Sequence, residues 1–223
     1  MKQIISILLL SLLLFSCVQS NNENGLGGYI DEETYQNEFM TDNDEPLILE
    51  MEFDSITIDT SFIDFTNNII AYLKNDNLIQ FATTFHPKKG CKFIPYPYLV
   101  EEDLVFSNDD FRKELQTNKK LHWGMYDSSG EPIDLTIKNY VKQFVYDVNY
   151  KDKATDININ ENLTISNTIN NISEFYPKAQ YIEFYYDGTA EFEGMDWSSL
   201  IFYIEKLNNK YYLVAVVHNQ WTI

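Results

Sequence analysis

The sequence predicts an α+β domain in which N-terminal helices pack on one face of a bent antiparallel sheet. Apolar residues recur at helical spacing in much of the first two thirds of the chain and at every second position in the last third. The chain also holds 16 Tyr and 15 Phe, and aromatic side chains favour strands. Helices followed by antiparallel strands are the element order of an α+β domain.

Four segments carry the helical pattern. Asp59 precedes the first one as an N-cap, and an Asn-Asp-Asn sequence after Lys74 separates it from the second, which ends before Pro87. Ser107 provides the N-cap of the third helix in the same way. The predicted helices are 60–74, 78–85, 108–115 and 136–146.

Strand patterns dominate the rest of the chain. Pro95 and Pro97 confine the extended segment 93–98 to a sheet edge or a loop, because proline cannot donate to a ladder. Asn208 and Asn209 predict a tight hairpin, since Asn tolerates positive φ. The other predicted strands are 47–58, 121–126, 163–169, 179–186, 200–207 and 211–217, and a turn is expected at 127–130.

The first seventeen residues predict export. A positive Lys2 is followed by an apolar run of twelve residues interrupted by two serines, which is too short to span a bilayer and is typical of a signal peptide. The ending Leu-Phe-Ser-Cys resembles a bacterial lipobox, in which the cysteine is lipidated and becomes the new N-terminus. We therefore expect a signal peptide at 1–16 and a lipid on Cys17.

Two further regions follow the signal peptide. Residues 17–46 are polar, acidic and nearly free of apolar periodicity, so they predict a flexible tether that cannot bury enough surface to fold. Residues 47–223 are expected to form a single α+β domain, which is long enough for a substantial core.

Charge and cysteine content narrow the function. The net charge of −18 argues against nucleic acid as a partner and against electrostatic docking on anionic lipid, so the membrane contact is expected through the lipid on Cys17. With Cys17 lipidated, Cys91 has no disulfide partner. Cys91 is interpreted as a small buried hydrophobe, with a reactive thiol as the alternative.

A series of short motifs resembles an uncharacterised family of bacterial secreted proteins and lipoproteins. The resemblance covers about 63–223 and implies no catalytic residue. The helix-then-sheet order also resembles the NTF2/cystatin-like cone, which implies a cavity between helices and sheet that is either filled or used for a small ligand. The motifs are HPxxG at 86–90, FxPY at 93–96, WGxYDxSGxPI at 123–133, FVYD at 144–147, NTIN at 167–170, EGMDW at 193–197 and HxQWTI at 218–223.

Each residue that could take part in chemistry also fits an ordinary structural role. The three histidines, at 86, 122 and 218, match no zinc spacing, so no metal and no cofactor are expected. Ser129 as a nucleophile lacks a G-x-S-x-G elbow and suits turn chemistry better. The remaining hypothesis is a ligand pocket, set against simple closure of the core. Its predicted lining residues are Tyr96, Trp123, Tyr126, His218 and Trp221.

These observations predict a lipid-anchored protein of the bacterial cell envelope. We expect a non-catalytic binding or interaction module whose ligand is a small molecule or a protein. The alternative is an enzyme that uses general acid–base chemistry in the cone's cavity, through His218 or Asp127. A purely structural envelope component has the same sequence features as the binding module.

Overall fold

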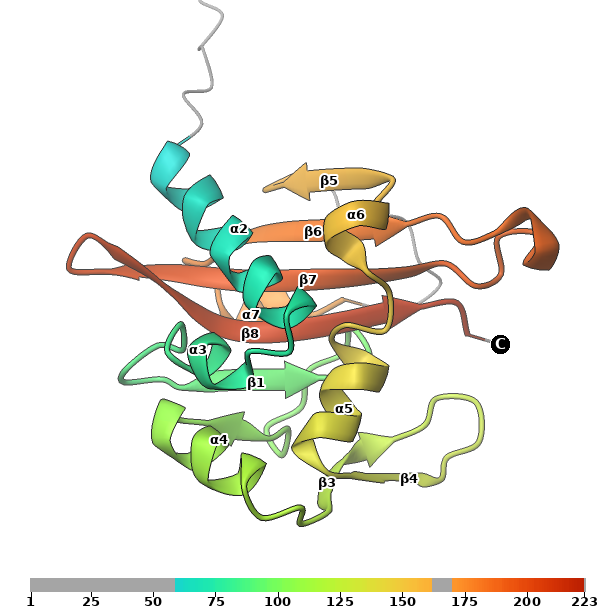
Figure 1. Cartoon of the computed structure of the whole chain (residues 1–223), viewed down its shortest axis with the longest axis horizontal. Helices are drawn as coiled ribbons and strands as arrows, with labels where there is room; N and C mark the ends of the chain where they lie inside the picture. Colours follow the sequence, from blue (N-terminus) through green and yellow to red (C-terminus); the bar gives the residue numbers. More distant parts are fainter. Residues whose placement is uncertain (1–58, 162–169, 223) are drawn as a thin grey trace, which may run out of the picture. The chain divides into compact units, whose positions relative to one another are not determined.

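The computed structural model describes residues 59–161 and 170–222, which belong to one compact unit of α+β class. Figure 1 shows helices lying across one face of a long twisted sheet. The helices are α2 (Thr60–Lys74), α3 (Leu78–Ala82), α4 (Asn108–Leu115), α5 (Ile137–Phe144), α6 (Tyr150–Lys153), α7 (Ile172–Phe175) and the short 3-10 helix η1 (Ala190–Phe192). The signal peptide, Cys17, the tether and the strands predicted at 47–58 and 163–169 lie outside the described residues.

Local sequence sets where the main helices begin. The side chains of Asp59, Ser107 and Thr136 each accept a hydrogen bond from a backbone N–H two or three residues further on. These N-caps satisfy donors that have no partner within the helix. The predicted starts of α2, α4 and α5 are therefore confirmed.

The main sheet has six strands in the order β2-β1-β8-β7-β6-β5, and β3 with β4 forms a separate hairpin below it in Figure 1. The strands are β1 (Cys91–Ile94), β2 (Val105–Phe106), β3 (Leu121–Met125), β4 (Pro132–Leu135), β5 (Asp156–Ile159), β6 (Gln180–Tyr186), β7 (Ser198–Leu207) and β8 (Lys210–Gln220). The hairpin of β7 and β8 turns at Asn208 and Asn209, with φ of 50° and 60°, as the sequence predicted.

The position of β1 corrects one prediction. Residues 93–98 were expected at an edge or in a loop. Residues 95–98 do lie in a loop, but Phe93 and Ile94 belong to β1, which is paired on both sides, antiparallel to β2 and parallel to β8. Pro95 and Pro97 follow Ile94, the last residue of the strand, so they remove no hydrogen bond from either ladder. The sheet is consequently mixed, and the pair of β1 with β8 is its parallel pair.

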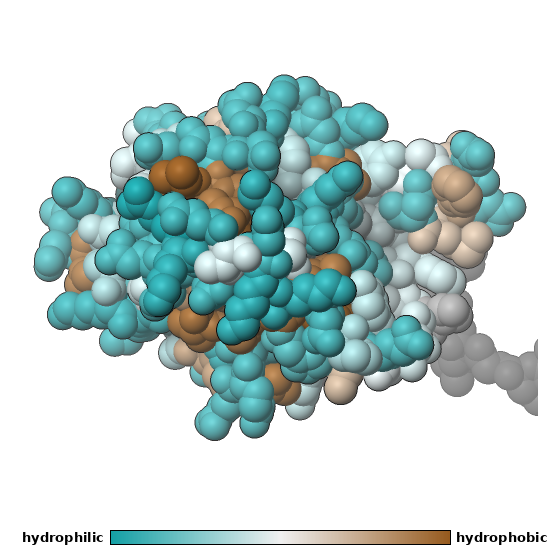
Figure 2. Space-filling view, turned by 60° about the horizontal axis from the view of Figure 1, so that its bottom comes forward, coloured by the Kyte–Doolittle hydropathy of each residue, from teal (hydrophilic) through white to brown (hydrophobic). Residues whose placement is uncertain are grey.

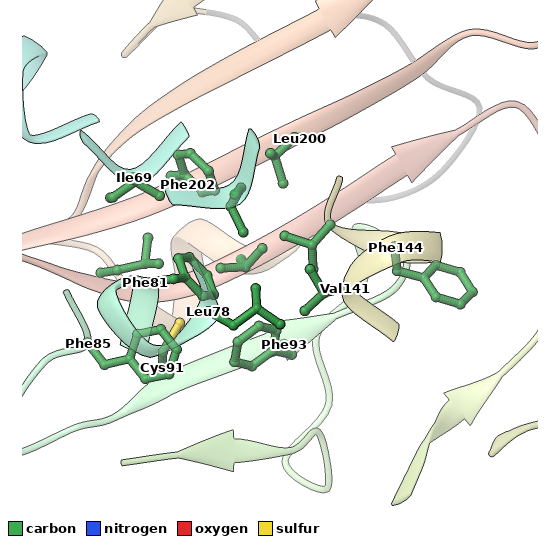
Figure 3. Packing of buried hydrophobic residues seen from close by; sticks show 14 of the residues in the cluster. Ile69, Leu78, Phe81, Phe85, Cys91, Phe93, Val141, Phe144, Leu200 and Phe202 are labelled. Carbon is green, nitrogen blue, oxygen red and sulfur yellow. The ribbon is translucent and has the colours of Figure 1, made fainter. Parts of the chain in front are cut away.

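The space between the helices and the sheet is filled by side chains. Figure 3 shows residues of α2, α3 and α5 meeting residues of the strands. Phe93 lies at the centre, stacked on Phe111 at 5.6 Å and edge-on to Trp123 at 5.9 Å between ring centroids. The fold class was predicted correctly, and in this part of the molecule the space under the helices is occupied by aromatic rings. Cys91 is 0% exposed within this core, as expected for a small hydrophobe.

A second, smaller core covers the opposite face of the sheet. Ile172 of α7 and Leu99 pack there against the strands. The Asn171 side chain ties the two segments together, because its Oδ1 accepts from Leu99 N at 2.7 Å and its Nδ2 donates to Leu99 O at 3.0 Å.

Candidate functional site

The candidate site is a cluster of four polar side chains at one end of the β7–β8 hairpin. Asp147 Oδ1 accepts a hydrogen bond from the Tyr150 hydroxyl at 2.8 Å. Asp147 Oδ2 accepts from the Ser198 hydroxyl at 2.9 Å and faces His218 Nε2 at 3.3 Å. The hydroxyl oxygens of Tyr150 and Ser198 lie 2.7 Å apart, and because each hydroxyl has one proton, a hydrogen bond between them forms only in place of one of the two bonds to Asp147. Each of these side chains therefore has a partner within the cluster.

His218 lies between two hydrogen-bond acceptors. The side chain of His218 is 0% exposed, and its Nδ1 faces the Pro95 carbonyl oxygen at 3.3 Å. A carbonyl and a carboxylate are both acceptors, so a ring that bonds to both donates from both nitrogens. The buried His218 ring therefore lies between the Pro95 carbonyl oxygen and the Asp147 carboxylate.

The electrostatics of Asp147 agree with that pairing. Burial by itself raises the pKa of the carboxyl, but hydrogen bonds from His218, Tyr150 and Ser198 and the charge of His218 outweigh it. The pKa of Asp147 therefore lies below its ordinary value of 3.8. The carboxylate is stabilised as an anion by groups that are themselves part of the fold.

Three separate elements bring the cluster together. Asp147 follows the end of α5, and Tyr150 begins α6 three residues later. Ser198 begins β7, and His218 lies near the end of β8, where it pairs with Leu200. The cluster thus ties the α5–α6 connection to the end of the central hairpin.

A hollow of about 470 Å³ opens beside the cluster. As a whole residue Asp147 is exposed, but its side chain is only 21% exposed, and it forms part of the hollow's wall. The remaining lining residues are mainly amides, with one cation. They are Leu135, Asn139, Lys142, Gln143 and Gln220.

Three of the five predicted pocket residues meet around Phe144. The ring centroids of Tyr96 and Tyr126 lie 6.0 Å from that of Phe144, and the His218 ring lies edge-on to it at 5.5 Å. Gln143 Nε2 donates to the Tyr126 hydroxyl at 3.1 Å. These rings therefore pack beside the hollow, while other residues line it.

The two tryptophans of the prediction lie elsewhere. Trp123 is 2% exposed and stacks on Tyr140 at 3.7 Å between centroids, and its Nε1 donates to Leu135 O at 2.9 Å. Trp221 is 40% exposed and follows the end of β8, where its backbone N–H donates to Trp197 O at 3.3 Å. The structure thus puts Trp123 in the core and Trp221 on the surface.

The other candidates occupy separate sites. His86 is buried, and its Nδ1 accepts from the backbone N–H groups of Lys88 and Lys89 at 3.1 and 3.0 Å. His122 is 56% exposed and faces Asp134 at 3.0 Å. Residues 59–161 and 170–222 contain no group of three or more His, Cys, Asp or Glu side chains placed to hold a metal ion.

Ser129 and Asp127 are exposed in the turn between β3 and β4. The Ser129 hydroxyl accepts from the Glu131 backbone N–H at 3.3 Å, which is ordinary turn chemistry. The buried Asp–His pair uses Asp147, whose place in the site was not predicted from the sequence. It stands in the FVYD motif, but its partners Ser198 and His218 lie 51 and 71 residues away.

Comparisons with known proteins add little to this geometry. No protein-family model and no curated protein matches the chain. A solved structure from Xanthomonas campestris, described as a calcium/calmodulin dependent protein kinase II association domain, is similar with a TM-score of 0.31 and 11% sequence identity, over 71% of this chain and 84% of that chain. At this level of similarity, the fold class rests on the elements described above. Within the part of the chain that the structure describes, no helix is long and apolar enough to cross a membrane.

Proposed function

We propose that this protein is a lipid-anchored, non-catalytic binding module of the bacterial cell envelope, held to the membrane through Cys17. We also propose that it belongs to the uncharacterised family of secreted proteins and lipoproteins that its motifs resemble, and that its domain is an NTF2-like cone. The helices α2, α3 and α5, which pack on one face of a six-stranded sheet, support the cone.

One observation carries the choice of binding over catalysis. The ionisable groups of the candidate site are bonded to one another, since Asp147 accepts from three side chains and His218 has no exposed surface. A general acid or base must reach the proton that it transfers. Next to this closed cluster lies an open hollow lined largely by amides, which suits recognition of a polar ligand.

The first described residue lies at the opposite end of the β7–β8 hairpin from the candidate site. Asp59, the first described residue, bonds to the Tyr211 hydroxyl at 2.5 Å and faces Lys206 Nζ at 3.4 Å, near the turn of the β7–β8 hairpin. Ser198 of the candidate site lies at the other end of β7. Lys206 stands eight positions after Ser198 in β7, which is roughly 26 Å at ~3.3 Å per residue.

A second candidate function is an acid–base enzyme. It is favoured by the Asp147 side chain, which carries a lowered pKa and is 21% exposed on the wall of the hollow. Titratable groups with a perturbed pKa are enriched at active sites, although structural ion pairs also perturb pKa values. An activity lost in Asp147→Asn, with folding and ligand affinity retained, would favour the enzyme over the module.

The anchoring is tested by expressing the full chain in a bacterium with a labelled fatty acid. We expect label on the wild-type protein and recovery in the membrane fraction. Cys17→Ser is expected to lose both, and Cys91→Ser, which removes the other cysteine, to keep the label. An unlabelled wild-type protein that is recovered free of membrane would contradict the anchored module.

A further inference from the structure

Two opposite charges line the hollow beside the candidate site. Asp147 and Lys142 are the two charged residues among the six that form its wall. Lys142 lies in the last turn of α5, and Asp147 follows the end of that helix by three residues. Lys142 forms no ion pair with Asp147 or with any other carboxylate of the described residues. The wall of the hollow therefore carries a cation and an anion that are separate from each other, and no net charge.

The Asp147 carboxylate can accept one more hydrogen bond. An ionised carboxylate offers about four acceptor positions, two on each oxygen. Oδ2 faces both the Ser198 hydroxyl and His218 Nε2, whereas Oδ1 accepts from the Tyr150 hydroxyl alone among the residues that the structure describes. The side chain is 21% exposed and lines the hollow, so a ligand can reach it. An ammonium group supplied by a ligand fits the position that is left.

Asp147 is better suited to hold a ligand's cation than an acid on the open surface. Burial raises the pKa of its carboxyl, but the hydrogen bonds and the charge of its neighbours in the cluster lower it below the ordinary value of 3.8. The carboxylate is therefore ionised at neutral pH, and the buried Tyr150 and Ser198 hold it in place. A charge that is fixed and partly shielded from water attracts a counter-ion more strongly than a mobile, solvated one.

Amide side chains form most of the remaining polar wall. Asn139 and Gln220 line the hollow, and their side chains make no hydrogen bond to another residue in the described part of the chain. Gln143 lines it too, but its Nε2 donates to the Tyr126 hydroxyl. A side-chain amide offers the same kinds of donor and acceptor as a peptide bond. The two free amides can therefore pair with N–H and C=O groups of a ligand.

Apolar anchoring is scarce in the hollow. Leu135 is its one apolar lining residue, and it is half-buried. Figure 2 brings the lower part of the view in Figure 1 forward and shows mainly hydrophilic residues, with hydrophobic ones in patches between them. The volume of about 470 Å³ lies within the roughly 300–1,000 Å³ of small-molecule sites. A small ligand held by polar groups therefore fits better than a protein segment anchored by apolar side chains.

The charges of the chain and of the hollow together define the charge of the ligand. The net charge of −18 repels a purely anionic ligand. A purely cationic ligand leaves the ammonium group of Lys142 facing another cation. A ligand that carries one charge of each sign meets both Asp147 and Lys142 with an opposite charge.

We propose that this hollow binds a small zwitterion, an amino acid or a short peptide with free termini, whose ammonium group contacts Asp147 and whose carboxylate contacts Lys142. The free amides of Asn139 and Gln220 contact the polar groups between the two charges. This inference rests on the proposed binding function and names its ligand class.

The test is a calorimetric titration of the full chain at neutral pH and low salt with the dipeptide alanylglutamine. Its N-acetylated form lacks the ammonium group, its C-terminal amide lacks the carboxylate, and free glutamine keeps both charges on one residue. The protein variants are Lys142→Gln and Asp147→Asn. Lys138→Gln is the matched control, because Lys138 is exposed one turn earlier on α5 and does not line this hollow.

We expect alanylglutamine to bind the wild type and Lys138→Gln equally, and to bind Lys142→Gln about three- to fivefold more weakly. Amidation of the ligand is expected to weaken binding to the wild type by the same factor, and to leave binding to Lys142→Gln unchanged, because that contact is already lost. N-acetylation is expected to weaken binding to the wild type about tenfold and to have no effect on Asp147→Asn. Circular dichroism checks that Asp147→Asn is folded, and the comparison at Lys142 tests the site independently of it.

Several results would overturn the proposal. One is that neither alanylglutamine nor glutamine binds the wild type. Another is equal weakening by Lys138→Gln and Lys142→Gln, and a third is an affinity that survives removal of either ligand charge. Tighter binding of alanylglutamine than of glutamine would identify the short peptide as the ligand, and the reverse the amino acid. The failures leave membrane attachment through Cys17 intact, which fatty-acid labelling measures separately, so they are distinguishable from failure of the anchored module.

Discussion

Replacing Asp147 by Asn removes the anion from the buried cluster while keeping the shape of the side chain. The wild-type carboxylate accepts two short hydrogen bonds, from Tyr150 at 2.8 Å and Ser198 at 2.9 Å, and a longer one from His218 at 3.3 Å. A hydrogen bond to a charged group contributes ~1.5–3 kcal/mol and a neutral one ~0.5–1.5 kcal/mol. The two short bonds therefore lose about 2 kcal/mol together, and the weaker contact with His218 brings the expected loss to about 2–3 kcal/mol.

The pH dependence of this loss identifies its cause. The folded-state pKa of Asp147 lies below the ordinary value of 3.8. A carboxyl of this kind contributes its full stabilisation above the unfolded-state pKa and loses it as the pH falls through the folded-state pKa. The stability difference between wild type and Asp147→Asn is therefore expected to be largest near pH 7, and to shrink below about pH 4.

The measurement is urea unfolding followed by tryptophan fluorescence over a pH series. For a domain of this size, the loss corresponds to a melting temperature lowered by roughly 5–10 °C. Asp134→Asn is the matched control, because Asp134 pairs with His122 where both side chains are more than half exposed. We expect it to cost less than about 1 kcal/mol. A stability difference for Asp147→Asn that is below that of the control, or that stays constant down to about pH 3, would refute the buried ion pair.

Three further predictions concern packing, backbone and thiol chemistry. Trp123→Ala is expected to lower the free energy of unfolding by about 3–5 kcal/mol, because the ring is buried against Tyr140. Trp221→Ala, at an exposed position, is expected to lower it by less than about 1 kcal/mol. Equal losses would contradict the different burial of the two rings. Gly188→Ala is expected to destabilise the protein more than Gly130→Ala does. Both glycines have positive φ, but an added Cβ at Gly188 meets Asp196 Oδ1 at 2.5 Å, whereas nothing lies within 4 Å of one at Gly130. Urea unfolding of the two glycine variants compares their free energies of unfolding. Burial raises the pKa of the Cys91 thiol well above its ordinary value, so in a Cys17→Ser background a thiol reagent is expected to react only after denaturation. Rapid labelling of the native protein would show that Cys91 is accessible.

Features governed by neighbouring residues were predictable from the sequence. The start of α2 follows from Asp59 and the helical spacing after it, and the hairpin of β7 and β8 follows from two asparagines that adopt positive φ. Each of these depends on interactions within a few residues, which composition and spacing record directly.

The place of β1 in the sheet was not predictable in the same way. Its prolines indicated an edge or loop, but the strand ends before them, and its partner β8 lies at the other end of the chain. A parallel pair between distant segments leaves no turn sequence that identifies it. Tertiary packing therefore overrode the local signal.

The residues of the candidate site were likewise predictable only in part from the sequence. Tyr96, Tyr126 and His218 were recognised as aromatic or titratable residues that belong together, and they do meet around Phe144. Asp147 was not predicted as a site residue, because nothing in the sequence around it distinguishes a buried acid from the other acidic residues among the 34.

The sequence by itself determined the starts of α2, α4 and α5, the β7–β8 hairpin, the acidic charge and the α+β class, since these depend on residue type and spacing. Only the tertiary structure decided that His218 and the Pro95 carbonyl, 123 residues apart, face each other beside Asp147, and that the Asp147 side chain lines an open hollow. The physical reason is that burial and hydrogen-bond pairing are properties of assembled surfaces. A residue's neighbours along the chain do not specify which distant segment will cover it.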